Sequence, residues 1–390
     1  MISEIMPSYA RVDIAFERGD GAYLYTGDGR RFLDFASGVA VTALGHNHPH
    51  LMETLTSQAA KLWHCSNLFR IPEQERLAHR LVADSFADTV FFCNSGAEAV
   101  EAGLKLVRKY HDDTGSPDRY RMITFDGSFH GRTLSTISAA ANPGHQKGFG
   151  PLVDGFDHVS FGNLNEVRSA ITPRTAAILV EPVQGEGGIR PGDAAFLKGL
   201  REACDEFGLL LFFDEVQTGI GRTGTLFAYE WAGVTPDVMA IAKGLGGGFP
   251  VGACLATERA AVGITAGTHG STFGGNPLAM AVANGVLDVI LGDGFLPHVR
   301  SMGELLMKRL SGLPQQTPKV IEAVRGVGLL IGLKCVPPAG EVVTACREAG
   351  LLTVPAADNV VRLLPPLIID ETHVAEACDM VEKACRALSS

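Results

Sequence analysis

The sequence predicts an α/β protein with a large domain, built on a mostly parallel seven-stranded sheet, and a smaller α+β domain. Three observations lead to this prediction. The 390 residues are too many for one ordinary core. From about residue 74, short apolar runs alternate with helical stretches, which is typical of parallel strands joined by helices. The runs are continuously apolar, as expected for strands that are covered on both faces.

Three segments follow one another along the chain. Residues 1–46 contain AYLYTGDGRRFLDF, two short strands around a TGDG turn, which predicts a hairpin. Residues 47–275 carry the alternating pattern and form the predicted large domain. Residues 276–390 begin with a helix from Pro277 to Leu291 and end with an amphipathic helix over ETHVAEACDMVEKACRAL. We expect the first and last segments to build the smaller domain.

The same pattern predicts the individual elements. A helix is expected from about Pro49, and further helices over Gln74–Ala87, Ala97–Tyr110 and Ala194–Phe207. The seven expected strands of the large domain are TVFFCN, RMITF, HVSF, AAILVEP, LLLFFDE, VMAIA and GACLA. In the last segment, RGVGLLIGLK and NVVRLLPPL are each expected to form a strand. The first of these lacks the correct spacing of a dinucleotide-binding fingerprint, which argues against a nicotinamide dehydrogenase.

Composition argues against several classes of partner. The net charge of −10 and the lack of any Lys/Arg-rich run disfavour nucleic acid and anionic membranes. The apolar runs are too short to span a bilayer. The eight cysteines have no metal-binding spacing, and GHNHPH is expected to form a turn rather than a metal site. We therefore expect a cytoplasmic protein with free thiols and no metal.

Polar residues directly follow five of the predicted strands. The turn Ser95-Gly96-Ala97 follows TVFFCN, DGSFHGRT follows RMITF, and EPVQGEGG follows AAILV. Asp214 follows LLLFF, and Lys243 follows VMAIA. Because the carboxyl ends of parallel strands meet at one edge of a sheet, we expect these residues to form a site there.

The residue types at this edge indicate a chemistry. A Ser-Gly-Ala turn at a helix start offers N–H groups and a positive helix dipole to a phosphate. A buried carboxylate such as Asp214 needs a cationic partner, and a desolvated lysine such as Lys243 becomes a nucleophilic amine. A helix cap, an ion pair and a solvent-reaching lysine would explain each feature alone. Their combination suits pyridoxal phosphate.

Six motifs strengthen this interpretation: CNSGAEA, SFHGRT, EPVQGEGG, FDEVQTGIGRTG, AKGLGGGFP and HGSTFGGNPLA. With them the sequence resembles the class III pyridoxal-phosphate aminotransferases of fold type I, most closely the acetylornithine aminotransferases, over nearly the whole chain. The resemblance implies transfer of the terminal amino group of N-acetylornithine to 2-oxoglutarate, in arginine biosynthesis. It also implies a homodimer with shared active sites.

The resemblance further assigns roles in holding the cofactor. Lys243 corresponds to the lysine that forms the Schiff base and moves the proton, and Asp214 to the partner of the pyridinium nitrogen. The other implied contacts are Ser95, Gly96 and Ala97 for the phosphate, Thr272 for the phosphate of the neighbouring subunit, Phe129 and Val216 for the two ring faces, and Gln217 for the ring hydroxyl.

Five residues correspond to substrate-binding positions. Arg132 resembles the arginine that binds a carboxylate distant from the reacting carbon, and Arg362 the one that binds the α-carboxylate of glutamate or 2-oxoglutarate. Glu186 resembles the acid that masks Arg362 while the amine donor is bound. Tyr9 and Ser271 complete the implied set. An ordinary structural ion pair would also explain either arginine.

One position bears on the choice of donor. Val39 stands where ornithine aminotransferases usually carry a tyrosine, and a small apolar residue suits a donor whose α-amine is acylated. The alternatives within the class are ornithine, succinylornithine, succinyl-diaminopimelate and 4-aminobutyrate aminotransferases. A non-catalytic protein of the same fold is a further alternative, against which Lys243 and Asp214 together argue.

Overall fold

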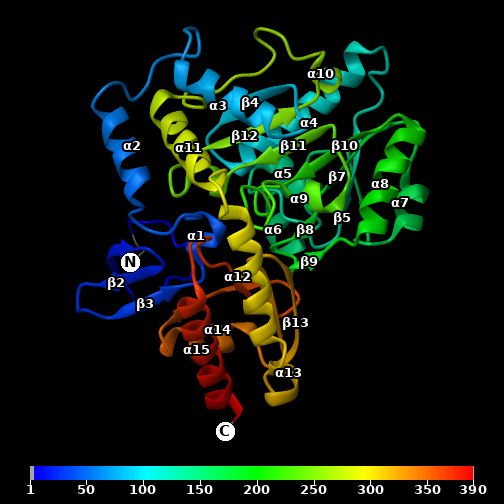
Figure 1. The fold of residues 1–390 in the computed structure, drawn as a ribbon. Coiled ribbons are helices and arrows are strands. Elements are labelled where there is room, and N and C mark those ends of the chain that lie inside the picture. Colours follow the sequence, from blue (N-terminus) through cyan, green and yellow to red (C-terminus); the bar gives the residue numbers. More distant parts are fainter. Residues whose placement is uncertain (1–3, 390) are drawn as a thin grey trace.

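A seven-stranded sheet lies at the centre of the computed structural model, which describes residues 4–389 (Figure 1). The strand order is β4-β12-β11-β10-β7-β5-β6, and only β12 runs antiparallel to its neighbours. The predicted mostly parallel sheet is therefore confirmed. Its strands are β4 (Thr89–Cys93), β5 (Arg121–Phe125), β6 (Phe156–Val159), β7 (Thr175–Val180), β10 (Leu210–Asp214), β11 (Val238–Ile241) and β12 (Gly252–Ala256).

Both faces of this sheet are buried. In β10, Leu211 and Phe213 belong to one hydrophobic cluster, whereas Leu210 and Phe212 belong to another. Helix α4 (Gly96–Asp113) contributes to the second cluster, and helices α3 (Pro72–Ala83) and α8 (Ala194–Phe207) contribute to the first. Two covered faces explain why the strands are continuously apolar in sequence.

Local capping fixes the ends of the helices beside the sheet. Ser95 caps α4 by accepting a hydrogen bond from Glu98 N, and Asp193 caps α8 in the same way. Gly208 closes α8 in the left-handed conformation. The other helices are α1 (Ser37–Ala40), α2 (Pro49–Ala59), α5 (Leu134–Ala139), α6 (Pro143–Gln146), α7 (Leu164–Ala170), α9 (Ala228–Ala232), α10 (Glu258–Ala261), α11 (Pro277–Ile290), α12 (Phe295–Leu310), α13 (Leu313–Gln316), α14 (Ala339–Glu348), α15 (Glu371–Ser389) and the 3-10 helix η1 (Lys243–Gly246).

The two ends of the chain build a smaller α+β part, seen below the large sheet in Figure 1. One sheet has the order β1-β2-β3-β15, so a C-terminal strand pairs in parallel with an N-terminal one. A second sheet has the order β13-β14-β17-β16. The strands are β1 (Phe16–Asp20), β2 (Tyr23–Thr26), β3 (Arg31–Asp34), β13 (Ile321–Val327), β14 (Leu330–Cys335), β15 (Leu351–Leu352), β16 (Val354–Ala356) and β17 (Val360–Leu363). A separate hairpin pairs β8 (Val183–Gln184) with β9 (Arg190–Pro191).

Two predicted strands need correction. RGVGLLIGLK is not one strand, because the chain reverses between β13 and β14. At this turn Gly328 has a φ of +57°, and a Cβ there would lie 2.6 Å from the backbone of Thr223. The apolar residues continue through the turn, so hydrophobicity alone did not reveal it. The strand expected over HVSF begins two residues earlier, at Phe156.

Helix α11 packs against α2 and α3 and is almost entirely buried.

The predicted segment boundaries at 46/47 and 275/276 stay predictions. Within residues 4–389, no single helix has the length and apolarity needed to cross a bilayer. The bent pair formed by α11 and residues 295–316 meets that test by length and composition alone.

Candidate active site

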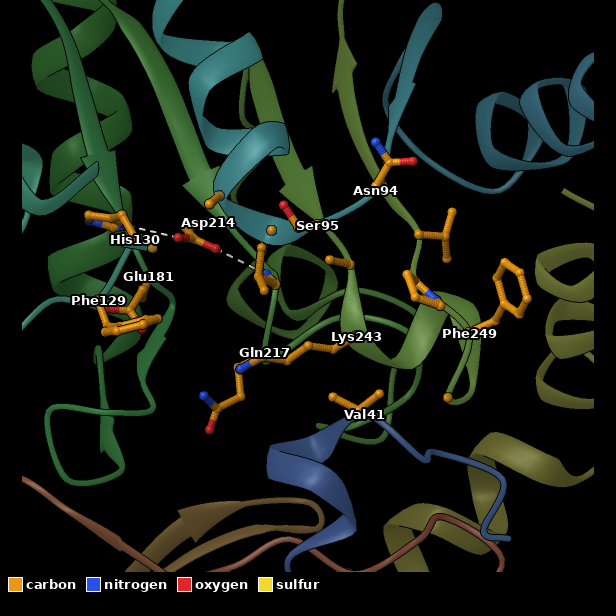
Figure 2. A pocket seen from close by; sticks show the side chains of 18 residues that line it. Val41, Asn94, Ser95, Phe129, His130, Glu181, Asp214, Gln217, Lys243 and Phe249 are labelled. Carbon is orange, nitrogen blue, oxygen red and sulfur yellow. Dashed lines mark hydrogen bonds and ion pairs between the residues drawn. The ribbon is translucent and has the colours of Figure 1, made fainter. Parts of the chain in front are cut away.

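A cavity of about 320 Å³ lies beyond the carboxyl ends of the central strands (Figure 2). Its walls include residues that follow β4, β5, β7, β10 and β11, as the strand-end pattern predicted. The predicted cofactor residues that line it are Ser95, Gly96, Ala97, Phe129, Asp214, Val216, Gln217 and Lys243. The fold thus brings residues from five separate parts of the sequence to one place.

The start of α4 forms one wall of this cavity. Ser95 Oγ accepts from Glu98 N at 3.3 Å, and the Glu98 carboxylate accepts from Asn94 N at 2.7 Å. Neither bond uses the N–H groups of Gly96 and Ala97, which carry the positive end of the helix dipole. A Cβ on Gly96 would lie 2.7 Å from Val216 Cγ1, so this close packing requires glycine. The wall is suited to a phosphate.

Asp214 is almost completely buried and faces the cavity (Figure 2). His130 Nδ1 lies 2.7 Å from Asp214 Oδ2, and Val216 N donates to Oδ1 at 3.0 Å. Burial alone would lower the pKa of His130, but the hydrogen bond and negative charge of Asp214 raise that pKa above its ordinary value. His130 is therefore the hydrogen-bonding partner that satisfies the buried carboxylate.

A second buried carboxylate, Glu181, joins two of the cavity loops. It accepts hydrogen bonds from Phe129 N at 3.0 Å and from Gly185 N at 3.3 Å. Burial raises the pKa of Glu181 to about 7. The first bond fixes the backbone of Phe129, and with it the position of the aromatic ring at the cavity wall.

Lys243 is the first residue of η1, and only Ala242 separates it from the end of β11. Its φ is +46°, a conformation that costs energy for any residue except glycine. Burial and the positive charge of Arg362 lower the pKa of Lys243 to about 8, although Asp214, Glu181 and Glu186 act in the opposite direction. A fraction of this lysine is therefore a neutral, nucleophilic amine near neutral pH.

Arg362 and Glu186 form an ion pair, with 2.7 Å between Nη2 and Oε2. Arg362 comes from β17 and is 1% exposed. Its Nη2 also donates to Pro355 O at 3.0 Å, and its Nη1 donates to Gln217 Oε1 at 3.4 Å. Burial lowers the pKa of Arg362, and the nearby Glu186 opposes that shift. The two residues predicted to act as a switch are therefore in direct contact beside a residue of the cavity wall.

Comparison with known proteins decides the family. The sequence pattern of Aminotransferase class-III matches residues 5–385. The chain belongs to the class-III aminotransferases. The acetylornithine aminotransferase of Mesorhizobium japonicum is 57% identical over 387 residues, which cover 99% of this chain and 97% of the relative.

Two solved structures are similar to this aminotransferase throughout. N-acetylornithine aminotransferase from Stenotrophomonas maltophilia is 38% identical, with a TM-score of 0.85 and 97% of both chains covered. Ornithine aminotransferase from Toxoplasma gondii is 31% identical, with a TM-score of 0.94, covering 98% of this chain and 92% of that one. In the latter structure pyridoxal phosphate partially occupies the active site. The predicted family, fold class and pyridoxal-phosphate-dependent aminotransferase activity are confirmed.

The residues of this aminotransferase fit that cofactor. The unused N–H groups at the start of α4 would hold the phosphate, in the space that Gly96 and Val216 leave. Asp214 would pair with the ring nitrogen, Lys243 would bind the aldehyde carbon, and Phe129 would cover the ring. These individual assignments stay predictions.

Six of the predicted residues do not line the cavity. Arg362 and Glu186 lie beside it, and Arg362 contacts its wall through Gln217. Arg132 is exposed, and its guanidinium carbon lies 5.7 Å from the centroid of the Phe129 ring. Tyr9 is 76% exposed. Thr272 and Ser271 line a separate surface hollow that shares the residue Asn94 with the cavity.

Sequence reasoning assigned no role to His130, Glu181 or Asn94. His130 follows Phe129 in the quoted motif SFHGRT, and Glu181 is the first polar residue after AAILV, so position alone gave a signal for both. Their hydrogen-bond partners come from distant parts of the chain. Asn94 Nδ2 donates to Ser271 Oγ at 3.3 Å and so joins the cavity to the hollow.

Proposed function

We propose that this aminotransferase transfers the terminal amino group of N-acetylornithine to 2-oxoglutarate. The observation that carries the proposal is the ion pair between the buried Arg362 and the partly exposed Glu186, beside Gln217. A guanidinium binds a carboxylate with fixed, two-point geometry, so Arg362 is suited to the α-carboxylate of 2-oxoglutarate. The 57% identity to an acetylornithine aminotransferase supports the choice of donor.

Bound pyridoxal phosphate supplies the ability to withdraw electrons from the carbon that carries the amine, which makes its C–H acidic. Lys243, with a lowered pKa, would take up that proton and pass it to the aldehyde carbon of the cofactor, and it would carry out the reverse transfer in the second half of the reaction. Asp214, held by His130, would keep a negative charge at the ring nitrogen. The N-terminus of α4 would hold the phosphate in place.

The Arg362–Glu186 pair allows one cavity to serve two substrates. While Glu186 neutralises Arg362, a donor that presents a terminal amine meets no unpaired guanidinium. When a dicarboxylate enters, the Glu186 side chain, which is 34% exposed, would turn away and free Arg362. Arg362 itself is held by Pro355 O and Gln217, so only the acid needs to move.

Two residues bear on the donor. Arg132 forms no ion pair with any residue in the described range 4–389, so its exposed guanidinium is available for the donor carboxylate. Val39 is partly buried against a cluster that contains Ile189 and Val360. Its small apolar side chain suits an acylated α-amine better than the charged amine of ornithine, which is the second candidate donor.

We further infer a homodimer. Exposed large apolar residues gather in two segments that are joined by hydrogen bonds from Asn67 Nδ2 to Ser271 O and Gly274 O. These residues are Leu62, Trp63, Leu68, Phe69 and Phe273. Such a patch is typical of a protein interface, and it lies beside Thr272, the residue expected to reach a neighbouring subunit.

All eight cysteines are free, which supports a reducing, cytoplasmic location.

The donor is tested by comparing kcat/KM for N-acetylornithine, ornithine, succinylornithine and 4-aminobutyrate, each with 2-oxoglutarate. We expect N-acetylornithine to give the highest value. A higher value for ornithine or 4-aminobutyrate would contradict the proposed donor. The Lys243→Ala variant is the control, and it should lose both the visible absorption of the bound cofactor and the activity.

A further inference from the structure

The loop that carries Glu186 is attached to the smaller α+β part at that residue and at Gly188. Residues 185–189 connect β8 to β9. Ala357 N donates to Glu186 O at 2.9 Å. Arg325, on β13, donates to Gly188 O from Nε at 2.9 Å and from Nη2 at 2.6 Å. The backbone of the loop is therefore held immediately at Glu186 and two residues beyond it.

Arg325 is in turn held by a charged turn. Its Nη2 lies 2.6 Å from Asp358 Oδ2, and Lys334 Nζ donates to Asp358 Oδ1 at 2.5 Å. Burial would raise the pKa of Asp358, but the hydrogen bonds from Lys334 and Arg325 outweigh this effect and lower it. Asp358 thus stays a carboxylate. It belongs to the turn between β16 and β17, and β17 carries Arg362.

The loop of residues 185–189 packs closely against the turn between β16 and β17. Gly188 has a φ of +105°, and a Cβ there would lie 2.8 Å from Ala357 O and 2.9 Å from Arg325 Nη2. The Glu186 side chain, in contrast, is 34% exposed. The contacts therefore restrain the backbone on which Glu186 stands and leave its carboxylate able to turn.

We propose that Arg325, with Asp358, is a positioning residue that fixes the Glu186 loop relative to Arg362 and so sets the balance between amine donor and dicarboxylate. This inference rests on the proposed two-substrate function. An ion pair between two fixed supports loses little conformational entropy when it forms. If the loop is loosened, Glu186 samples more conformations and loses more entropy when it pairs with Arg362. The ion pair that masks Arg362 therefore becomes weaker.

Loss of Arg325 should therefore shift the two substrates in opposite directions. In Arg325→Gln, Arg362 is unmasked more often, so a dicarboxylate should bind about fivefold more tightly, because it displaces Glu186 more easily. The donor should need a concentration about fivefold higher for half-saturation, because it must bind beside an exposed positive charge. A merely structural defect would weaken both.

Two measurements on the cofactor-loaded enzyme test this. The first is the dissociation constant of glutarate by calorimetry; glutarate has both carboxylates of 2-oxoglutarate but no keto group, so it cannot react. The second is the half-saturation constant of the donor half-reaction, followed by absorbance in single turnovers. Arg325→Lys keeps the charge but only one donor group, so its shifts should be smaller.

A matched control removes a similar bridge elsewhere. Arg119 donates from Nε to Thr175 O and from Nη2 to Phe207 O, both at 2.9 Å, far from the Glu186 loop in sequence and contacts. Arg119→Gln should change neither constant. Glu186→Gln should reproduce the shifts of Arg325→Gln, and the double variant should add little to Glu186→Gln, because both act through one ion pair.

Equal weakening of both substrates in Arg325→Gln, or no change in either constant, would overturn the inference. If that variant does not fold, Asp358→Asn removes the charge that holds Arg325 in a turn that tolerates asparagine, and the same criteria apply. If N-acetylornithine is not a substrate of the wild type, the donor constant is measured with whichever of ornithine, succinylornithine and 4-aminobutyrate the wild type accepts, so failure of the proposed donor is distinguishable from failure of the positioning role.

Discussion

Lys243 shows how one position combines a strained backbone with an altered charge equilibrium. Its φ of +46° is sustained only because the surrounding elements fix it, and such strain gathers at functional sites. Burial, together with Arg362, lowers its pKa to about 8. The ammonium form predominates below that pH, and the neutral amine predominates above it.

This titration leads to a prediction for the cofactor-free protein. The rate at which it regains visible absorption after addition of pyridoxal phosphate should rise with pH and level off above about 8, because only the neutral amine attacks the aldehyde. Stopped-flow absorbance at saturating cofactor measures this rate. A rate that continues to rise to pH 10 would contradict the lowered pKa. Lys243→Arg should not regain the absorption.

At the residue scale, the sequence identified groups that interrupt apolar runs. Asp214, Lys243 and the Ser95 turn each follow a buried strand, and all three reach the cavity. It could not identify what supports them, because His130 meets Asp214 across 84 positions of the sequence. Tyr9, assigned by resemblance in the N-terminal segment, is exposed in the single chain.

At the scale of elements, the sequence predicted the buried helices and strands more accurately than the turns. The bounds of α8 match the predicted range, because its apolar periodicity and its Asp193 and Gly208 caps agree. All seven strands of the large sheet were expected, since each is an apolar run between helices. The β13–β14 turn was missed, because Gly328 is required there by its close contact with the backbone of Thr223. That contact joins distant parts of the chain, so the local sequence did not indicate it.

The element that carries Lys243 was also only partly foreseen. The apolar run VMAIA was expected to deliver the lysine at a strand end, but β11 stops at Ile241 and Lys243 begins a 3-10 helix. Gly247 and Gly248 then take positive φ values of +56° and +122°. The glycines therefore permit a tight reversal next to the lysine, whereas the phosphate wall comes from α4, far upstream.

At the scale of the whole molecule, the apolar patch beside Thr272 predicts a stable dimer. Leu68 is 89% exposed and Phe69 is 69% exposed in the single chain. The double variant Leu68→Ser, Phe69→Ser should shift the mass measured by light scattering from two chains toward one, because burial of this surface drives association. Activity should fall with it.

Val336, which is 54% exposed in the smaller α+β part, offers the matched control. Val336→Ser should leave both mass and activity unchanged. A wild-type protein that is monomeric and fully active would contradict the shared active site.

The central claim is that one cavity serves two substrates because Glu186 and Arg362 can separate. The most direct test follows the two half-reactions of Arg362→Ala separately, with N-acetylornithine and then with 2-oxoglutarate, by single-turnover absorbance. We predict that the 2-oxoglutarate half-reaction slows by about a hundredfold or more, as expected when a buried charge partner is removed, while the donor half-reaction changes much less. Equal slowing of both half-reactions would contradict the account.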